Sequence, residues 1–119
     1  MDISEMDIST PLKPAILHIL LALATEDRHG YGIMQAVREQ SRGTVPLRTG
    51  SFYRHLSNLI DAGWVVEAEG RPEHDDPRRG AYYRLTEAGR DAVATERRRL
   101  GALLAAFPSN DGSTRERPA

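Results

Sequence analysis

The chain of 119 residues has the length of a single domain and contains no cysteine, which excludes disulfide scaffolds, thiolate zinc sites and cysteine nucleophiles. Its net charge of −1 argues against a protein that coats nucleic acid indiscriminately. The charge is unevenly distributed, however. Residues 28–63 contain five arginines and two acids, whereas the first nine residues contain three acids and no base.

The N-terminal region begins with a short repeat, in which residues 1–4 recur as residues 6–9 without a periodic apolar face. We expect residues 1–9 to form a flexible leader. The apolar stretch 16–24 is about half as long as a bilayer-spanning helix, and acidic residues stand where a secretory signal needs positive charge. The sequence therefore predicts a cytoplasmic protein with no membrane segment.

Two helices are predicted in the first third of the chain. Thr10 can cap the first, a proline suits its first turn, and apolar residues at helical spacing predict that it covers residues 11–25. Residues 26–30 are expected to form a polar turn. The second helix is expected to begin near Tyr31 and to end near residues 41–43, with Gly43 as a suitable C-terminal cap.

A third helix follows, for which Thr49 offers a cap. Arg54 and Asn58 point away from its apolar side, and Tyr53 and His55 lie on the two flanks. The apolar side itself falls within a sector of roughly 100° on a helical wheel. It comprises Phe52, Leu56, Leu59, Ile60 and Gly63.

Residues 64–69 and 81–85 are rich in β-branched and aromatic side chains and predict a hairpin. The loop between them, residues 70–80, is much longer than an ordinary hairpin turn. Thr86 is expected to cap a final helix over residues 86–107, whose apolar stripe exceeds what a small three-helix core needs and therefore favours a partner helix.

This order of elements predicts a mainly α fold with a small β-hairpin, a winged helix-turn-helix. The winged domain would cover residues 10–85, the last helix residues 86–107 and a disordered polar tail residues 108–119. In such a fold the third helix enters the major groove of DNA, and the hairpin loop lies along the backbone or in the adjacent minor groove.

The start of the third helix is expected to offer backbone N–H groups and hydroxyls to phosphates, with Arg54 able to reach guanine acceptors. Asn58 lies one turn further along the helix, where it either contacts base edges in the groove or lies outside the groove. Tyr31 either donates to a phosphate or packs against the third helix. Arg78 and Arg79 would anchor the hairpin loop to the DNA backbone or to the minor groove. The predicted DNA contacts are Tyr31, Thr49, Gly50, Ser51, Tyr53, Arg54, Asn58, Arg78 and Arg79.

Catalytic and metal chemistry are disfavoured. His74 stands beside Asp75 and Asp76, but a zinc site needs three or four converging ligands. The other histidines have no acid at a recurrent spacing, so no catalytic set can be assembled. The expectation is a protein that is not an enzyme and needs no metal or cofactor.

Several segments together resemble the PadR family of transcriptional regulators, in particular its short members with one C-terminal helix. Leu20 and Leu21 lead to the segments HGYG (29–32), GSFYRHLSNL (50–59), GWVV (63–66) and RRGAYYRLTEAG (78–89). The resemblance implies a homodimer on a near-palindromic operator and, as in many relatives, a repressor released by a small molecule or stress signal. The expected dimer contacts are Leu12, Ile16, Val93, Leu100, Leu103, Leu104 and Phe107.

One departure from the family leaves an alternative open. The family's hairpin loop is usually strongly basic, whereas five acids crowd it here: Glu67, Glu69, Glu73, Asp75 and Asp76. The alternative hypothesis is a winged-helix module that binds another protein and not DNA. Trp64 is expected to close the core beneath the third helix in preference to lining a ligand pocket.

Overall fold

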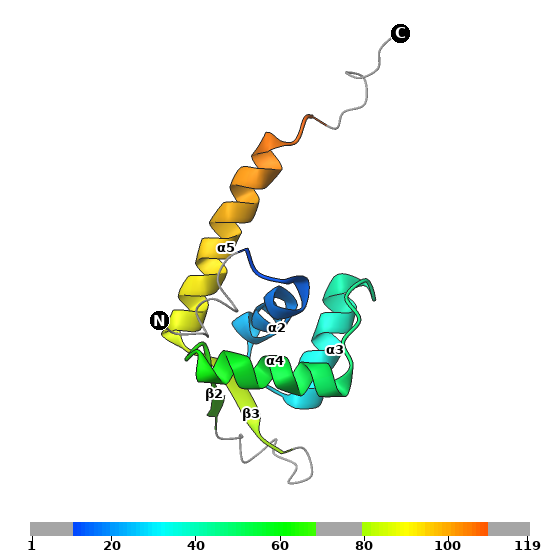
Figure 1. Cartoon of the computed structure of the whole chain (residues 1–119), viewed down its shortest axis with the longest axis vertical. Coiled ribbons are helices and arrows are strands. Elements are labelled where there is room, and N and C mark those ends of the chain that lie inside the picture. The colour runs from blue at the N-terminus through cyan, green and yellow to red at the C-terminus, as the bar shows by residue number, and fades with distance from the viewer. Residues whose placement is uncertain (1–10, 69–79, 110–119) are drawn as a thin grey trace.

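The computed structural model describes residues 11–68 and 80–109. Within these ranges the chain forms four helices and a small antiparallel sheet, and the last helix projects well beyond the others (Figure 1). The mainly α winged helix-turn-helix architecture is thus confirmed. In chain order the elements are α2 (Pro14–Thr25), β1 (Arg28–His29), α3 (Gly30–Ser41), α4 (Thr49–Asp61), β2 (Val65–Ala68), β3 (Tyr82–Leu85) and α5 (Glu87–Ala106).

The predicted leader, residues 1–9, lies outside the described residues, and so do the capping residue Thr10 and most of the predicted tail. α2 starts three residues later than the sequence pattern suggested. Lys13 keeps an extended backbone (φ −66°, ψ 150°) because it precedes Pro14, and Pro14 occupies the first turn of the helix. The expected start at residue 11 is therefore wrong.

Two further predictions concern the end of α3 and the N-cap of α4. α3 ends within the expected stretch, at Ser41, but its C-cap residue is Arg42, with a φ of 53°. Gly43 follows with a φ of 77°, and its N–H donates to the carbonyl of Arg38 at 3.0 Å. α4, in contrast, is not capped by Thr49. Arg48 is the N-cap residue, and its carbonyl accepts the N–H of Phe52 at 2.8 Å. Thr49 therefore lies inside the first turn.

The sheet has three strands in the order β1-β3-β2, where the sequence predicted only a hairpin. β1 pairs Arg28 with Tyr83 and His29 with Tyr82. On the other side of β3, β2 pairs Val65 with Leu85. The expected polar turn at residues 26–30 thus contains a two-residue strand, which is too short to produce an alternating sequence pattern.

One hydrophobic core joins α2, α3, α4 and the two longer strands. Trp64 packs against its edge, as expected from the sequence. α5 contributes little to this core, because Val93 is its one apolar residue among the described side chains that pack there. The most deeply buried side chains of the core are Ile19, Leu20, Ile33, Val37, Phe52, Leu59, Val65 and Leu85.

The junction between β3 and α5 is closely packed against the turn that follows α4. Thr86 accepts the N–H of Gly89 at 3.0 Å, as its predicted cap role requires, and its hydroxyl donates to the carbonyl of Gly63 at 2.6 Å. The Thr86 N–H donates to the carbonyl of Trp64 at 3.0 Å. Gly89 lies so close to that same carbonyl that a Cβ atom would overlap it. The start of α5 is therefore fixed in position.

A buried carboxylate holds the middle of α5 to the segment that precedes α2. Glu96 is only 1% exposed, and it accepts the backbone N–H of Leu12 at 3.2 Å and two bonds from Arg99 at 2.9 and 2.7 Å. Arg99 lowers the pKa of Glu96, with help from the Leu12 N–H and against the effect of burial. The carboxylate therefore stays ionised inside the protein.

Gly89→Ala is expected to lower the free energy of unfolding by about 1–3 kcal/mol, because the new Cβ must displace the Trp64 backbone. Gly50→Ala is the matched control, since its Cβ would meet no atom within 4 Å, and the loss of a helical glycine should leave stability unchanged or raise it by up to about 1 kcal/mol. Urea unfolding followed by circular dichroism measures both changes. Equal effects of the two substitutions would contradict this account.

Glu96→Gln is expected to lower the free energy of unfolding at pH 7 by about 1–3 kcal/mol, whereas Glu39→Gln on the exposed side of α3 should change it little. Because the folded-state pKa is lowered, the stabilisation by Glu96 is complete above the ordinary value of 4.5 and is lost as the pH falls through the folded value. The difference between wild type and Glu96→Gln should therefore shrink below about pH 4.5. Urea titrations from pH 7 to pH 3 test this, and a difference that does not change with pH would disprove it.

Candidate nucleic-acid interface

α4 separates its side chains into a core face and a solvent face, as its sequence pattern predicted, except that Ile60, expected on the core face, is 36% exposed. Phe52, Leu56 and Leu59 are buried, whereas Arg54 and Asn58 are exposed. Thr49 and Gly50 are exposed in its first turn, and Ser51 is half-buried. The predicted contact residues of this helix are thus at least partly accessible, and all except Asn58 lie in its N-terminal half. Their contact with DNA stays a prediction.

Tyr53 lies on the flank of α4 that faces the start of α3. Its ring packs edge-on against Phe52, with centroids 4.7 Å apart, and remains 47% exposed. A Cβ atom at Gly30 would come within 2.5 Å of the Tyr53 hydroxyl oxygen, so the tyrosine could keep this position only if residue 30 had no side chain. Tyr53 therefore both supports the packing of α4 against α3 and offers part of its ring to solvent.

Tyr31, in the first turn of α3, is 64% exposed, so it is not packed beneath α4. His29 fixes this turn as the N-cap residue, because its Nδ1 accepts the N–H of Gly32 at 3.2 Å. The His29 ring also meets Tyr82 edge-on, with centroids 5.5 Å apart. The geometry leaves the hydroxyl of Tyr31 available to a ligand at the same end of the molecule as Tyr53.

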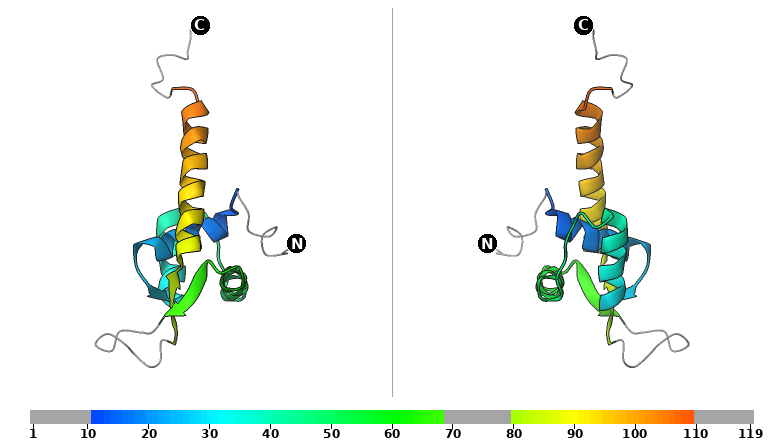
Figure 2. Two further views of the ribbon diagram at one scale, coloured as in Figure 1. Left: turned by 90° about the vertical axis from the view of Figure 1, so that its left-hand side faces the viewer. Right: turned by 90° about the vertical axis from the view of Figure 1, so that its right-hand side faces the viewer.

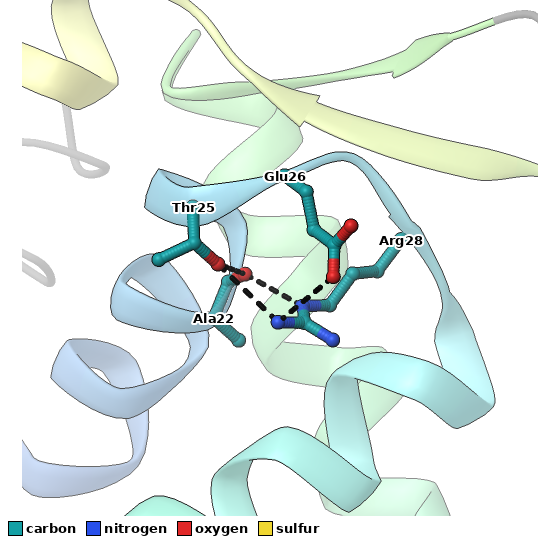
Figure 3. Close-up of polar contacts among 4 residues, drawn as sticks. All are labelled: Ala22, Thr25, Glu26 and Arg28. Carbon is teal, nitrogen blue, oxygen red and sulfur yellow. Dashed lines mark hydrogen bonds and ion pairs between the residues drawn. The ribbon is translucent and has the colours of Figure 1, made fainter.

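Arg28 is one of the five arginines that make residues 28–63 basic, but its charge is used within the fold (Figure 3). Its Nε donates to the carbonyl of Ala22 at 2.7 Å. Its Nη2 donates to the Thr25 hydroxyl at 3.2 Å and lies 3.4 Å from the Glu26 carboxylate. Arg28 thus caps the C-terminal end of α2, where a cation is favourable. The accessible positive charge therefore comes from the other arginines.

Arg48 and Arg54 carry accessible charge at the N-terminal half of α4. Neither guanidinium forms a hydrogen bond or ion pair with another residue in 11–68 or 80–109, and both residues are exposed. Arg48 was not among the predicted contacts, although its position directly before the helix was a usable signal. A phosphate near this helix start would meet two unpaired cations and the positive end of the helix.

The opposite flank of α4 carries His55, which is half-buried. Burial lowers the pKa of His55 from its ordinary value of 6.5, and the positive charges of Arg54 and Lys13 lower it further. On the hairpin side, burial raises the pKa of Tyr83, with smaller contributions from Glu67 and Tyr53. The His55 flank of α4 is therefore near positive charges, whereas the Tyr53 flank is near the sheet.

The predicted hairpin anchors Arg78 and Arg79 lie outside the described residues, as does most of the acidic loop tip. The same holds for the rejected metal cluster at His74, Asp75 and Asp76. Among the residues that the structure does describe, no group of three or more histidine, cysteine or acidic side chains could hold a metal ion. None of the described helices combines the length and hydropathy needed to cross a bilayer.

Comparison with known proteins identifies the family. The sequence model of the transcriptional regulator PadR-like family matches residues 16–95. The chain belongs to the PadR-like family. PadR-like proteins are transcriptional regulators and not enzymes, and the matched region includes the whole of α3, α4 and the sheet. No curated protein sequence matches the chain.

Solved structures agree with this PadR-like assignment. RosR from H. salinarum, in the crystal form grown from NaBr, is 26% identical, with a TM-score of 0.66 over 84% of each chain. A PadR family transcription regulator from Clostridium difficile R20291 is 20% identical, with a TM-score of 0.65 over 78% of this chain and 93% of that one. A transcriptional regulator from Clostridium thermocellum is 20% identical, with a TM-score of 0.62 over 79% and 92%. The last two show likeness of fold.

The PadR-like chain has a second accessible surface, on α5. Leu104 is 73% exposed and Phe107 is 65% exposed, although both are large and apolar. Beside them an apolar groove of about 380 Å³ runs between α2 and α5. Its lining consists of Leu17, Leu21, Val93, Arg97, Leu100, Gly101 and Leu104.

The structure divides the expected dimer contacts into two groups. Leu12 and Ile16 are buried in the core of the single chain, so they have almost no surface to offer a partner. Val93 is half-buried at the edge of the groove. The exposed contacts are confined to the C-terminal half of α5, namely Leu100, Leu103, Leu104 and Phe107. The sequence pattern could not separate the groups, because both show apolar residues at helical spacing.

Proposed function

We propose that this PadR-like chain is a sequence-specific DNA-binding regulator that acts as a homodimer on a near-palindromic operator, most simply as a repressor. The observation that carries the proposal is the N-terminal half of α4, where Arg54 and the first-turn groups are exposed and unpaired. A basic helix start on a winged-helix scaffold suits entry into the major groove.

Each predicted contact has a role in this proposal. Arg54 reads guanine through its two parallel N–H donors. Tyr31 and Tyr53 donate hydroxyls to phosphates, and the remaining groups of the first turn offer backbone N–H donors. Asn58 contacts base edges one turn deeper. The other proposed contacts are Thr49, Gly50, Ser51, Arg78 and Arg79.

The dimer would form through α5. Leu103, Leu104 and Phe107 leave an apolar surface on one chain, and the groove between α2 and α5 offers a complementary apolar surface on the other. A twofold axis lets each helix fill the partner's groove, so both surfaces are covered at once. Two α4 helices related by such an axis suit an inverted repeat. The repressor action and the release by a small molecule stay predictions.

Arg54→Ala is expected to lose about 1–3 kcal/mol of binding free energy on the preferred duplex and to relax the preference for one base pair, because a bidentate contact to guanine is lost. The preferred duplex comes from selection of bound sequences from a random pool. Fluorescence anisotropy on that duplex and on single-base variants measures both effects. Arg98→Ala on α5 is the control and should change neither. A selection that recovers no inverted repeat would contradict the proposal.

Leu104→Glu is expected to convert a dimer into a monomer, because a carboxylate in the shared apolar contact loses its hydration. Ala102→Glu is the control, since Ala102 lies on the opposite side of the same helix. Sedimentation equilibrium should give twice the chain mass for the wild type and for Ala102→Glu, and the single chain mass for Leu104→Glu. A monomeric wild type would disprove the dimer.

The alternative of a protein-binding module makes a different prediction for non-specific DNA. A DNA-binding protein should retain affinity for a random duplex at low salt, because phosphate contacts supply that term. Absence of such binding would favour the alternative. The acidic loop tip that motivated it lies outside the described residues.

A further inference from the structure

Three groups that carry or can acquire positive charge lie near the middle of α4, where the charges of Arg54 and Lys13 both act on His55. Arg54 and His55 belong to α4, and Lys13 is the exposed N-cap residue of α2. Within residues 11–68 and 80–109, none of the three side chains forms a hydrogen bond or an ion pair. The charged groups that act on His55 are Arg54 and Lys13, and both disfavour its protonated form. Like charges gathered without a counter-ion favour a bound anion.

The position of this cluster follows from helix geometry. Successive residues turn by about 100°, so Tyr53 and His55 lie on opposite flanks of α4. The Tyr53 flank contacts Gly30 at the start of α3, whereas His55, on the other flank, is within electrostatic range of Lys13. In the left view of Figure 2, the start of α2 lies above α4, and β2 runs downward on the other side. The cluster and the hairpin are therefore on different sides of α4.

An α-helix about as wide as the major groove has a sugar-phosphate strand along each flank when it enters the groove. In the proposed function, the hairpin and the first turn of α3 contact the sugar-phosphate strand on one flank of α4. We infer that Lys13 and His55 contact a phosphate of the other strand, with His55 in its protonated form. This inference rests on the proposed function. It adds a contact that the sequence analysis did not predict.

The contact makes DNA binding depend on pH. In the free protein, burial and the neighbouring cations keep His55 mostly neutral at pH 7. A bound phosphate favours the imidazolium, so the pKa of His55 rises in the complex and binding takes up a proton. Affinity should therefore increase as the pH falls from about 7.5 to about 5.5, by uptake of at most one proton per subunit at this site.

The test uses the full chain and a fluorescein-labelled random-sequence duplex of about 24 base pairs, followed by anisotropy as pH and KCl are varied. Lys13→Gln should weaken binding about 3–10-fold at low salt and reduce the salt slope by about one. Arg98→Gln, which removes a charge from α5, is its control. His55→Gln should abolish most of the pH dependence, whereas His18→Gln in α2 should keep it. Circular dichroism melting checks that all variants fold.

A second measurement follows His55 in the wild-type protein and uses a variant only to assign the resonance. The proton resonance of the His55 imidazole, assigned with His55→Gln, gives its pKa with and without the duplex. The expected result is a higher pKa in the complex, and an unchanged value would overturn the inference.

The failures are distinguishable. A wild type that does not bind the duplex at low salt disproves the proposed function together with this inference. A wild type that binds, with Lys13→Gln and His55→Gln equal to their controls, overturns the inference alone.

Discussion

The close packing of α5 against the turn after α4 determines how the two accessible surfaces of the molecule relate. Thr86 bonds to Gly63, Trp64 and Gly89, and Gly89 leaves no room for a side chain against the Trp64 carbonyl. α4 ends immediately before this turn, and α5 begins beside it in space, directly after β3. The direction of the proposed dimer helix is therefore set by the end of the proposed reading helix. A looser junction would leave the distance between two α4 helices undefined.

The charge distribution explains how a chain of net charge −1 can present a basic surface. Some cations are used inside the fold: Arg28 caps α2, Arg84 pairs with Asp27 at 2.9 Å, and Arg99 neutralises Glu96. The cations around α4 have no such partners among the described residues. Paired charges contribute little to the long-range field, so the field of this face is set by the unpaired ones. Counting charges along the sequence cannot separate the two groups.

The sequence predicted what depends on local patterns. Most of the core face of α4, the cap by Thr86 and the end of α3 just before Gly43 follow from periodicity and from backbone preferences, and all three are observed. What it missed depends on contacts between distant segments. β1 is too short to show a pattern, and Glu96 looks like any other acid on a helix until Leu12, 84 residues away in sequence, donates to it. Lys13 likewise comes within electrostatic range of His55 only when α2 and α4 join the same core.

The hydrogen bond between Glu96 and Leu12 connects the proposed dimer helix, α5, with the segment that precedes α2. Leu12 is adjacent to Lys13, so the segment that carries this lysine is attached to the middle of α5. A displacement of α5 relative to α2 would thus be transmitted to the edge of the proposed DNA-binding surface. By thermodynamic reciprocity, anything that binds differently to two positions of α5 would alter the affinity at that edge, and DNA would alter its binding by the same factor. One buried carboxylate thereby gives the fold a route for long-range coupling.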